Sequence, residues 1–327
     1  MFGHAEPVYA EPMAHDDPTA ATIAAARTRI AGYLRPLAVR RSDALSASID
    51  GDVRLICENE QPTGSFKIRG ASNAVLSLLG EGVTGLTTAS TGNHARAVAH
   101  VGRAHDLAVR AFVSRDVSDG RVRRLRGLGA DVDASATDQT EAIERARAYA
   151  ERHGYGFVPP FDDPAVIEGQ GTLGLEISDA LPTLDDVIVP VSGGGLAAGV
   201  AVALEHALPD VRVIGVCADR APAMKAALDA GRPVEVNERT TIAESLRGDL
   251  GRDNRYTFRL VRDHVDTVEL VTEDAIVDAQ ERLLAADRID AEGAAAAAAA
   301  YVQSRPQSFT GRQVAIIVTG AADEPRG

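Results

Sequence analysis

Short apolar runs of strand length alternate with helical segments along almost the whole 327-residue chain. Because strands that alternate with helices usually pair as a parallel sheet covered by helices, this pattern predicts a wound α/β fold. A run of alanines at 294–300 further predicts a tightly packed, buried helix. The expected strands cover residues 53–57, 85–89, 108–113, 130–134, 156–158, 187–191, 211–217, 265–271 and 313–318.

The same pattern divides the chain into two parts. Three prolines between residues 159 and 164 interrupt it near the middle, and the four strands before them form a compact run that can close as a unit. We therefore expect a small α/β domain at 85–158, inserted in a large domain formed by 21–84 and 159–327. Residues 1–20, which contain several prolines and charges, are expected to form a disordered tail.

Composition argues against several classes of function. The formal net charge is −13 and no block of Lys and Arg is present, so we expect no nucleic-acid partner. Cys57 and Cys217 lie far apart without metal-ligand spacing, which argues against a disulfide framework or a zinc site and favours the cytoplasm. The N-terminus lacks the features of a signal peptide, and proline and glycines interrupt the apolar window 187–204, so we expect no membrane span.

Three segments match the glycine pattern G-x-G-x-x-G/A of dinucleotide-binding loops, at 80–85, 169–174 and 193–198. Only the third follows an expected strand and opens a helix, which is the context that a phosphate site requires. Asp219 lies about 20 residues further on, where a nicotinamide-dependent dehydrogenase would bind a ribose. A dehydrogenase using Gly193, Gly195 and Asp219 is therefore one alternative, and a loop that only packs a helix on a sheet is another.

Lysine is rare in this chain: of the 34 basic residues only Lys67 and Lys225 are lysines. Lys67 lies between Phe66 and Ile68, near the start of an expected helix. An amine buried beside apolar side chains has a lowered pKa and becomes a usable nucleophile or Schiff-base former. Lys225 lies on an expected surface helix and should tolerate replacement.

Four segments, in this order and spacing, resemble the fold-type II pyridoxal-phosphate enzymes, in the branch of threonine/serine dehydratases and serine racemases. They are PTGSFKIRGA at 62–71, STGNH at 90–94, GQGTLGLEI at 169–177 and SGGGL at 192–196. The resemblance extends from about residue 35 to 322 and implies two wound α/β domains with the cofactor between them. Three further segments, at 90–100, 159–164 and 251–258, are most similar to dehydratase-like proteins associated with hydroxyectoine utilisation.

The resemblance also implies roles for individual residues. Lys67 would hold pyridoxal 5'-phosphate through a Schiff base and remove the Cα proton of the substrate, while Phe66 and Asn93 would flank and hydrogen-bond the ring. Thr319 would face the pyridine nitrogen. The cofactor phosphate would be bound by Ser192, Gly193, Gly194, Gly195 and Leu196.

The resemblance places the substrate in a second loop. Its carboxylate would be bound by Ser90, Thr91, Gly92, Asn93 and His94. Thr91 is also a catalytic candidate, because racemising relatives use a hydroxyl there to protonate the opposite face. Judged from the residues alone, Ser, Thr and Asn before a helix are better explained as N-caps.

Some residues depart from the pattern of the family. Cys217 and Ala223 stand where some relatives bind a divalent cation through acidic side chains, so we predict no metal. Glu244 and Ser245 replace a common Asp-Gly pair beside the cofactor, which is expected to reshape the substrate pocket. Thr319 is followed by Gly-Ala-Ala rather than by the usual glycine-rich ending.

These observations predict a pyridoxal-phosphate-dependent dehydratase that eliminates water from a hydroxy amino acid such as L-threonine or L-serine. The Thr319 hydroxyl supplies no charge to stabilise a protonated ring, which favours prompt loss of a β-leaving group. Because the sequence stops soon after the last strand, we expect no regulatory domain and a catabolic role.

Several alternatives stay open. They are racemisation, 3-hydroxyaspartate dehydration, elimination from a modified diamino acid of ectoine degradation, and a non-catalytic ligand sensor. The expected partners are the amino-acid substrate and a second copy of the chain in a homodimer.

Overall fold

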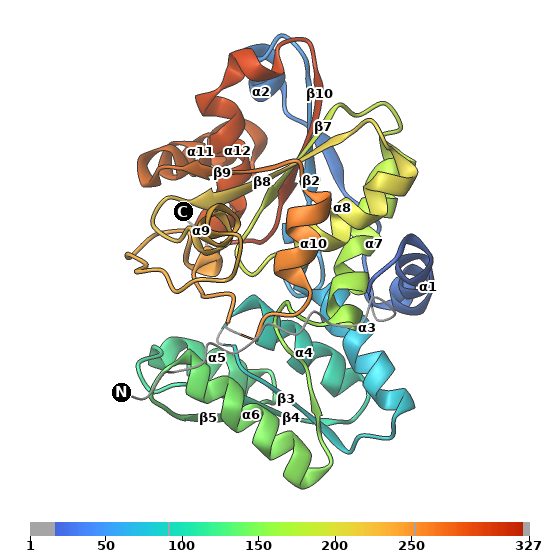
Figure 1. The fold of residues 1–327 in the computed structure, drawn as a ribbon, viewed down its shortest axis with the longest axis vertical. Coiled ribbons are helices and arrows are strands. Elements are labelled where there is room, and N and C mark those ends of the chain that lie inside the picture. Colours follow the sequence, from blue (N-terminus) through green and yellow to red (C-terminus); the bar gives the residue numbers. More distant parts are fainter. Residues whose placement is uncertain (1–16, 91, 252, 323–327) are drawn as a thin grey trace, which may run out of the picture.

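The computed structural model describes residues 17–90, 92–251 and 253–322. Ten strands lie in these ranges (Figure 1). They are β1 (Val39–Arg41), β2 (Asp52–Cys57), β3 (Gly85–Thr88), β4 (Ala108–Ser114), β5 (Asp131–Ala136), β6 (Gly156–Phe157), β7 (Asp186–Pro190), β8 (Arg212–Ala218), β9 (Thr267–Val271) and β10 (Gln313–Val318).

The strands form two separate sheets. A six-stranded sheet has the order β1-β2-β10-β7-β8-β9, and a four-stranded sheet has the order β5-β4-β3-β6. Every neighbouring pair is parallel except β1 and β2. The predicted wound α/β fold is therefore confirmed.

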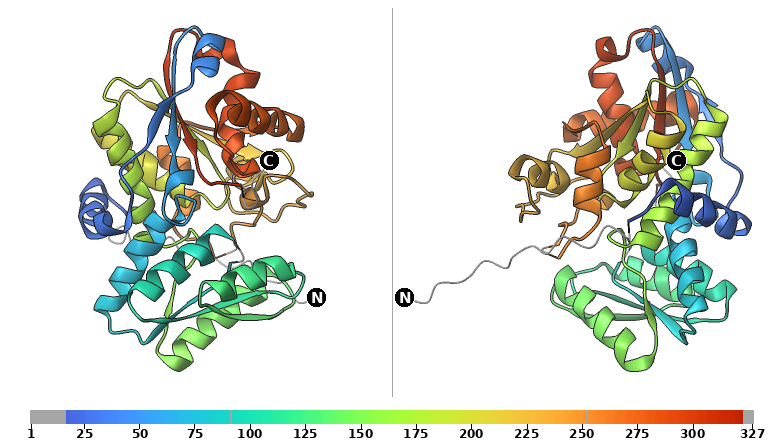
Figure 2. Two further views of the ribbon diagram at one scale, coloured as in Figure 1. Left: turned by 180° about the vertical axis from the view of Figure 1, so that it is seen from behind. Right: turned by 45° about the vertical axis from the view of Figure 1, so that its right-hand side comes forward.

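Helices cover both faces of each sheet (Figures 1 and 2). On the large sheet, α2, α11 and α12 pack on one face and α1, α7, α8, α9 and α10 on the other. On the small sheet, α4 and α5 pack on one face and α6 on the other. Their bounds are α1 (Ala20–Ile30), α2 (Asp43–Ser48), α3 (Lys67–Gly80), α4 (Asn93–Ala104), α5 (Asp119–Gly127), α6 (Gln139–His153), α7 (Pro164–Ala180), α8 (Gly195–Ala207), α9 (Ala223–Ala230), α10 (Thr257–His264), α11 (Glu273–Asp287) and α12 (Gly293–Ser304).

The nine strands expected from the sequence are all present, with shifts of one or two residues at most ends. The alanine run lies in α12, where every residue of 294–300 is buried, as predicted. Strand β1 was not predicted, because only one of its three residues is apolar. It pairs antiparallel at the edge of the large sheet, where tertiary pairing rather than local pattern decides the structure.

The four predicted strands between residues 85 and 158 make up the small sheet. We call this sheet with α4, α5 and α6 the small lobe, and the six-stranded sheet with its helices the large lobe. The domain boundaries stay a prediction. Residues 1–16 of the predicted tail lie outside the described residues, and α1 begins at Ala20. Among the described residues, no helix is long and apolar enough to span a membrane.

The glycine pattern at 169–174 serves helix packing. It lies inside α7, where a Cβ on Gly169 would come within 2.5 Å of the Arg69 carbonyl oxygen on α3. A Cβ on Gly171 would come within 2.8 Å of the Gly199 carbonyl oxygen on α8. These glycines let three helices pack backbone against backbone, so the segment is not a nucleotide loop.

A buried ion network fixes α3 against α7. The Arg69 side chain is fully buried and donates to both oxygens of Glu58, each at 2.8 Å, and to Glu176 at 2.9 and 2.8 Å. It also donates to the Thr172 hydroxyl at 3.0 Å. Because all these groups are paired, the network anchors the helix that begins at Lys67.

Candidate active site

Adjacent parallel strands bring the predicted site residues to one edge of the large sheet. Strand β10 pairs with β2 on one side and β7 on the other, so the segments that follow these strands meet at their carboxyl ends. Open α/β sheets bind ligands at this edge. Lys67 follows β2, Thr319 follows β10, and the glycine loop at 192–196 follows β7.

Lys67 is the first residue of α3 and is half-buried. Its Nζ donates a 2.6 Å hydrogen bond to the carbonyl oxygen of Pro160 and lies 5.1 Å from the centre of the Phe66 ring. Burial lowers the pKa of Lys67 to about 8, and the charge of Glu292 opposes part of this effect. A substantial fraction of this amine is therefore neutral near physiological pH, as a nucleophilic lysine requires.

The glycine loop forms a cradle of backbone donors. Gly194 has φ +88°, and a Cβ there would come within 2.6 Å of Met224 Cε, so only glycine fits without strain. At Gly193 a Cβ would come within 2.4 Å of the Phe161 ring. No described side chain caps the N-terminus of α8, which leaves the first N–H groups of the helix for an anion. The loop therefore suits a phosphate group.

Thr319 lies beside the lysine loop. The Phe66 N–H donates to the Thr319 carbonyl oxygen at 3.1 Å, and the Ala321 N–H donates to the Gly64 carbonyl oxygen at 2.9 Å. These bonds hold residues 64–66 and 319–321 side by side as a short antiparallel pair. The side chain of Thr319 is nearly buried, and its hydroxyl has no hydrogen-bond partner among the described residues.

Asn93 begins α4 and is fully engaged through its amide. Its Nδ2 donates to Glu292 Oε1 at 2.9 Å, and its Oδ1 accepts from Arg96 Nη2 at 2.9 Å. The Gly92 N–H donates to the Ser90 hydroxyl at 3.3 Å. Thr91 lies outside the described residues.

The His94 side chain is almost completely buried, at 2% exposure. Its Nε2 lies 3.0 Å from the Val158 carbonyl oxygen, which can only accept, so Nε2 carries the proton. Burial, followed by the charge of Lys67, lowers the pKa of His94 to about 3 and keeps the ring neutral. In this arrangement His94 ties α4 to the segment that carries Pro160.

Glu292 is a site residue that the sequence analysis did not assign. It immediately precedes α12, and its two carboxylate oxygens accept from Asn93 Nδ2 at 2.9 Å and from the Ser245 hydroxyl at 2.8 Å. The alanine run that follows Glu292 indicates a helix, but it does not indicate that the acid before it belongs to the site. A lone acidic residue between loop and helix is a common N-cap, and no spacing rule links it to Lys67.

The predicted departure at Glu244 and Ser245 therefore lies beside the site. Both residues belong to η4 (Glu244–Leu246), a single turn of 3₁₀ helix. Ser245 contacts Glu292, whereas Glu244 forms an ion pair with Arg121 of α5 in the small lobe. This turn thus links the site to the lobe opposite.

Residues 159–164 connect the small sheet to the large one and contact the site at three points. Pro160 accepts from Lys67, and Phe161 packs under Gly193. The Asp162 carboxylate accepts backbone N–H bonds from residues 255–257 at 2.7, 2.9 and 2.9 Å. Two segments that the sequence analysis grouped together, 159–164 and 251–258, are thus in direct contact.

The other predicted residues lie elsewhere. Lys225 is on α9 and forms an ion pair with Asp229, one helical turn away. Cys217 is buried, which raises the pKa of its thiol to about 12. In the described ranges no three His, Cys, Asp or Glu side chains are grouped to hold a metal ion, and the absence of a metal stays a prediction.

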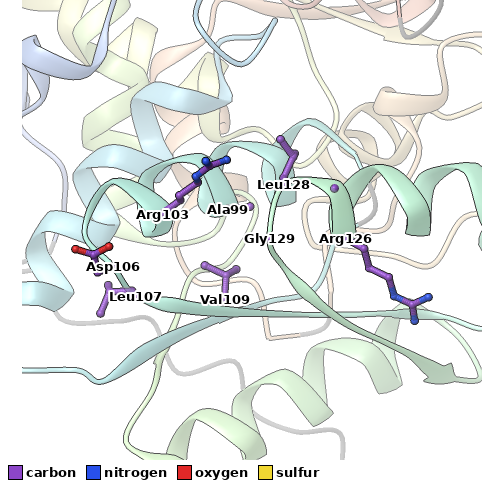
Figure 3. A pocket seen from close by; sticks show the side chains of 9 residues that line it. Ala99, Arg103, Asp106, Leu107, Val109, Arg126, Leu128 and Gly129 are labelled. Carbon is purple, nitrogen blue, oxygen red and sulfur yellow. The ribbon is translucent and has the colours of Figure 1, made fainter.

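A pocket of about 350 Å³ lies outside this site, on the small lobe between α4 and the end of α5 (Figure 3). Its lining includes Arg103, Asp106 and Arg126, none of which belongs to the candidate site. The two arginine side chains point in different directions and do not converge on a common point (Figure 3). We assign this pocket no role.

Comparison with known proteins agrees with this geometry. Residues 30–320 match the family model described as pyridoxal-phosphate dependent enzyme. The chain is 39% identical to the L-threonine ammonia-lyase of Thermotoga maritima over 284 residues, covering 86% of this chain and 70% of that protein. It is 35% identical to the catabolic L-threonine dehydratase of Escherichia coli K12 over 315 residues, covering 95% and 94%.

Among solved structures, maize serine racemase aligns with a TM-score of 0.86 and 31% identity, covering 94% of this chain and 96% of that chain. These matches agree with a half-buried lysine and an uncapped glycine loop at the same edge of the large sheet. The chain belongs to the family of pyridoxal-phosphate dependent enzymes.

Proposed function

We propose that this protein is a dehydratase that eliminates water from a β-hydroxy amino acid such as L-threonine or L-serine and releases a 2-oxo acid and ammonia. The observation that carries the proposal is the placement of Lys67. Its half-buried amine lies at the sheet edge where the uncapped loop 192–196 and the Thr319 hydroxyl also lie. The named relatives that share most of the chain support the same reaction.

The residues present fit pyridoxal phosphate. Lys67 would hold it covalently, the N–H groups of 192–196 would bind its phosphate, and Phe66 and Asn93 would contact its ring. The unpartnered hydroxyl of Thr319 would face the ring nitrogen. When bound, the cofactor supplies an electron sink that makes the Cα–H bond of an amino acid acidic.

Lys67 is the base in this proposal. Its neutral amine would take the Cα proton, and the Cβ–OH bond would break with protonation of the leaving oxygen, so that water leaves. The resulting enamine hydrolyses in water to the 2-oxo acid and ammonia. Because a hydroxyl rather than a carboxylate faces the ring nitrogen, Thr319 adds no negative charge, which favours rapid elimination over long-lived carbanion chemistry.

A visible absorption spectrum and a 2-oxo acid assay test this function. We expect purified protein to be yellow and to release a 2-oxo acid from L-threonine, L-serine or threo-3-hydroxyaspartate. A yellow protein that is inert to all three substrates would contradict the dehydratase assignment, and a colourless protein that cannot be reconstituted would contradict the cofactor site as well.

A narrower proposal concerns the substrate. The contact of Asp162 with residues 255–257 joins two of the segments that resemble hydroxyectoine-utilisation proteins. The resemblance itself, rather than this contact, supports a lyase that acts on a modified diamino acid such as an intermediate of ectoine degradation. Turnover of such a substrate at a kcat/KM at least about tenfold above that of L-threonine would favour it.

Three further features belong to the proposal. Residues 85–158 form a small inserted domain. The enzyme acts as a homodimer in the cytoplasm. Its two unpaired, buried cysteines are in keeping with that compartment. Thr91 protonates the opposite face of the substrate, which gives a racemase side activity. Sedimentation velocity tests the dimer, and chiral analysis of serine left after partial turnover tests the side activity.

A further inference from the structure

Glu292 uses both carboxylate oxygens and its backbone in the site. Oε1 accepts from Asn93 Nδ2 at 2.9 Å, and Oε2 accepts from the Ser245 hydroxyl at 2.8 Å. The Glu292 N–H donates to the Gly320 carbonyl oxygen at 3.1 Å. Contacts from three different parts of the chain therefore hold one half-buried acid.

Gly320 permits this position. A Cβ on residue 320 would come within 2.4 Å of Glu292 Oε1 and 3.3 Å of Asn93 Nδ2. The same glycine forms an antiparallel bridge with Ser65, two residues before Lys67. The carboxylate thus lies directly against the backbone pair that supports the lysine loop.

The hydrogen bonds also determine how the Asn93 amide is turned. The Arg96 guanidinium can only donate, and an ionised carboxylate can only accept. Arg96 contacts Oδ1 and Glu292 contacts Nδ2, so the two ends of the amide are distinguished by their partners. Loss of the carboxylate would remove one of these two constraints.

Charge connects Glu292 to Lys67. The titratable groups that act on Lys67 are Glu292, before α12, and His94 on α4, which is neutral. Glu292 is therefore the negative charge that offsets the burial of the Lys67 ammonium group. Two donors on its oxygens favour the ionised form of the acid.

We propose that Glu292 is a positioning residue, whose carboxylate balances the Lys67 ammonium group and orients Asn93, and that Ser245 holds Glu292 in place. The inference rests on the proposed function, in which Lys67 is the reacting amine. Ser245 stands where the sequence resemblance leads us to expect glycine, so this clamp is a departure specific to the present chain. It predicts that the pKa of Lys67 depends on the charge of Glu292 and on the hydrogen bond from Ser245 that holds Glu292.

The scarcity of lysine makes the test direct. In full-length protein freed of cofactor, competitive labelling of amines followed by peptide mapping reports Lys67 and Lys225 in separate peptides. Glu292→Gln keeps the size of the side chain and removes its charge, so we expect the pKa of Lys67 to fall below the wild-type value of about 8. A fall of about one pKa unit raises the neutral fraction of the Lys67 amine at pH 7, and with it the labelling rate, about fivefold.

Ser245→Ala is the second variant. Ser245 is exposed, so the protein should fold without its hydroxyl. We expect the pKa of Lys67 to fall here too, with a rise in its labelling rate of about twofold. Asp229→Asn is the matched control, because it removes the carboxylate that pairs with Lys225 and should leave Lys67 unchanged. In the reconstituted proteins, Glu292→Gln should also weaken pyridoxal phosphate binding, through the loosened Asn93 amide.

Each outcome decides a separate claim. An unchanged or raised pKa of Lys67 in Glu292→Gln overturns the role of Glu292. If the pKa of Lys67 falls in Glu292→Gln but does not change in Ser245→Ala, the role of Ser245 is overturned. Borohydride reduction of the wild-type holoenzyme, with mapping of the modified lysine, tests the proposed function separately, since a cofactor attached elsewhere would contradict it whatever the titrations show.

Discussion

The Lys67 amine and the Pro160 carbonyl oxygen form a 2.6 Å hydrogen bond that joins the first residue of α3 to the segment connecting the two sheets. The acceptor is an uncharged backbone oxygen, so this bond holds the amine without forming an ion pair. Burial lowers the pKa of Lys67 to about 8, and Glu292 limits the fall. An amine in this state is retained in place and can still lose its proton readily.

The role of Lys67 predicts a large and selective effect of its replacement. Lys67→Ala removes the only amine at the site, so we expect 2-oxo acid release to fall by at least about 10³-fold, with loss of the visible absorption band. Lys225→Ala changes the other lysine, on the surface helix α9, and should leave kcat/KM within about twofold. Near wild-type turnover by the Lys67 variant would refute the assignment.

The lowered pKa predicts how cofactor capture depends on pH. Only the neutral amine is nucleophilic, so the rate at which the cofactor-free protein takes up pyridoxal phosphate should rise with pH and reach half its maximum near pH 8. Below pH 8 the rate of uptake should fall about tenfold for each pH unit. Stopped-flow absorbance between pH 6 and 10 measures this rate. A rate that does not change with pH would contradict the lowered pKa of Lys67.

The glycine cradle predicts a selective loss of phosphate binding in Gly194→Ala. The variant suffers both the positive φ of +88° and the approach to Met224, so we expect the Kd for pyridoxal phosphate to rise at least about tenfold. Binding of pyridoxal, which lacks the phosphate, should change far less. Gly231→Ala is the matched control, because Gly231 has φ +71° but nothing within 4 Å of a Cβ.

Two ion pairs between the lobes predict a salt-dependent KM. Arg121 pairs with Glu244, and Arg147 pairs with Asp253 at 3.3 Å. Both pairs are exposed, so each should contribute only about 0.2 to 1 kcal/mol and weaken at high ionic strength. We expect Glu244→Gln to raise KM up to about fivefold at low salt, with little effect at 1 M salt and no change in the visible spectrum. Equal KM values for wild type and variant at low salt would show that the pair does not hold the lobes together.

The buried network at Arg69 predicts a stability defect rather than a chemical one. Arg69→Leu leaves Glu58 buried and unpaired, so we expect unfolding free energy to fall by about 3 to 5 kcal/mol. Thermal unfolding of the holoenzyme measures this loss. Arg27→Ala, which breaks an exposed pair with Asp179, should cost less than about 1 kcal/mol, and similar losses in both variants would contradict the network's structural role.

Sequence reasoning succeeded where a local pattern carries the structure. Strand β10 was predicted over its full length because 314–318 is apolar, and these five residues are buried in the sheet centre. Among the three matches to the glycine pattern, context after a strand selected 193–198, and the structure places the other two at the end of α3 and inside α7. Local sequence also led to the expectation that Lys67 is embedded among apolar neighbours, and the structure shows it half-buried, while its catalytic role stays a prediction.

It failed where distant segments define the feature. Strand β1 exists because residues 39–41 pair with β2, and Glu292 belongs to the site because Asn93 and Ser245 donate to it across 199 and 47 residues. The bond between His94 Nε2 and the Val158 carbonyl oxygen is another contact that no spacing rule reports, and the role of His94 in substrate binding stays a prediction. Such contacts depend on tertiary packing, which a single sequence leaves open.

The connecting segment 159–164 has a mechanical consequence. It supports the lysine through Pro160, the phosphate cradle through Phe161 and the loop at 255–257 through Asp162. Any displacement of residues 159–164 would therefore change the surroundings of Lys67 and of the glycine loop at 192–196 at the same time, so this linker couples the two mechanically.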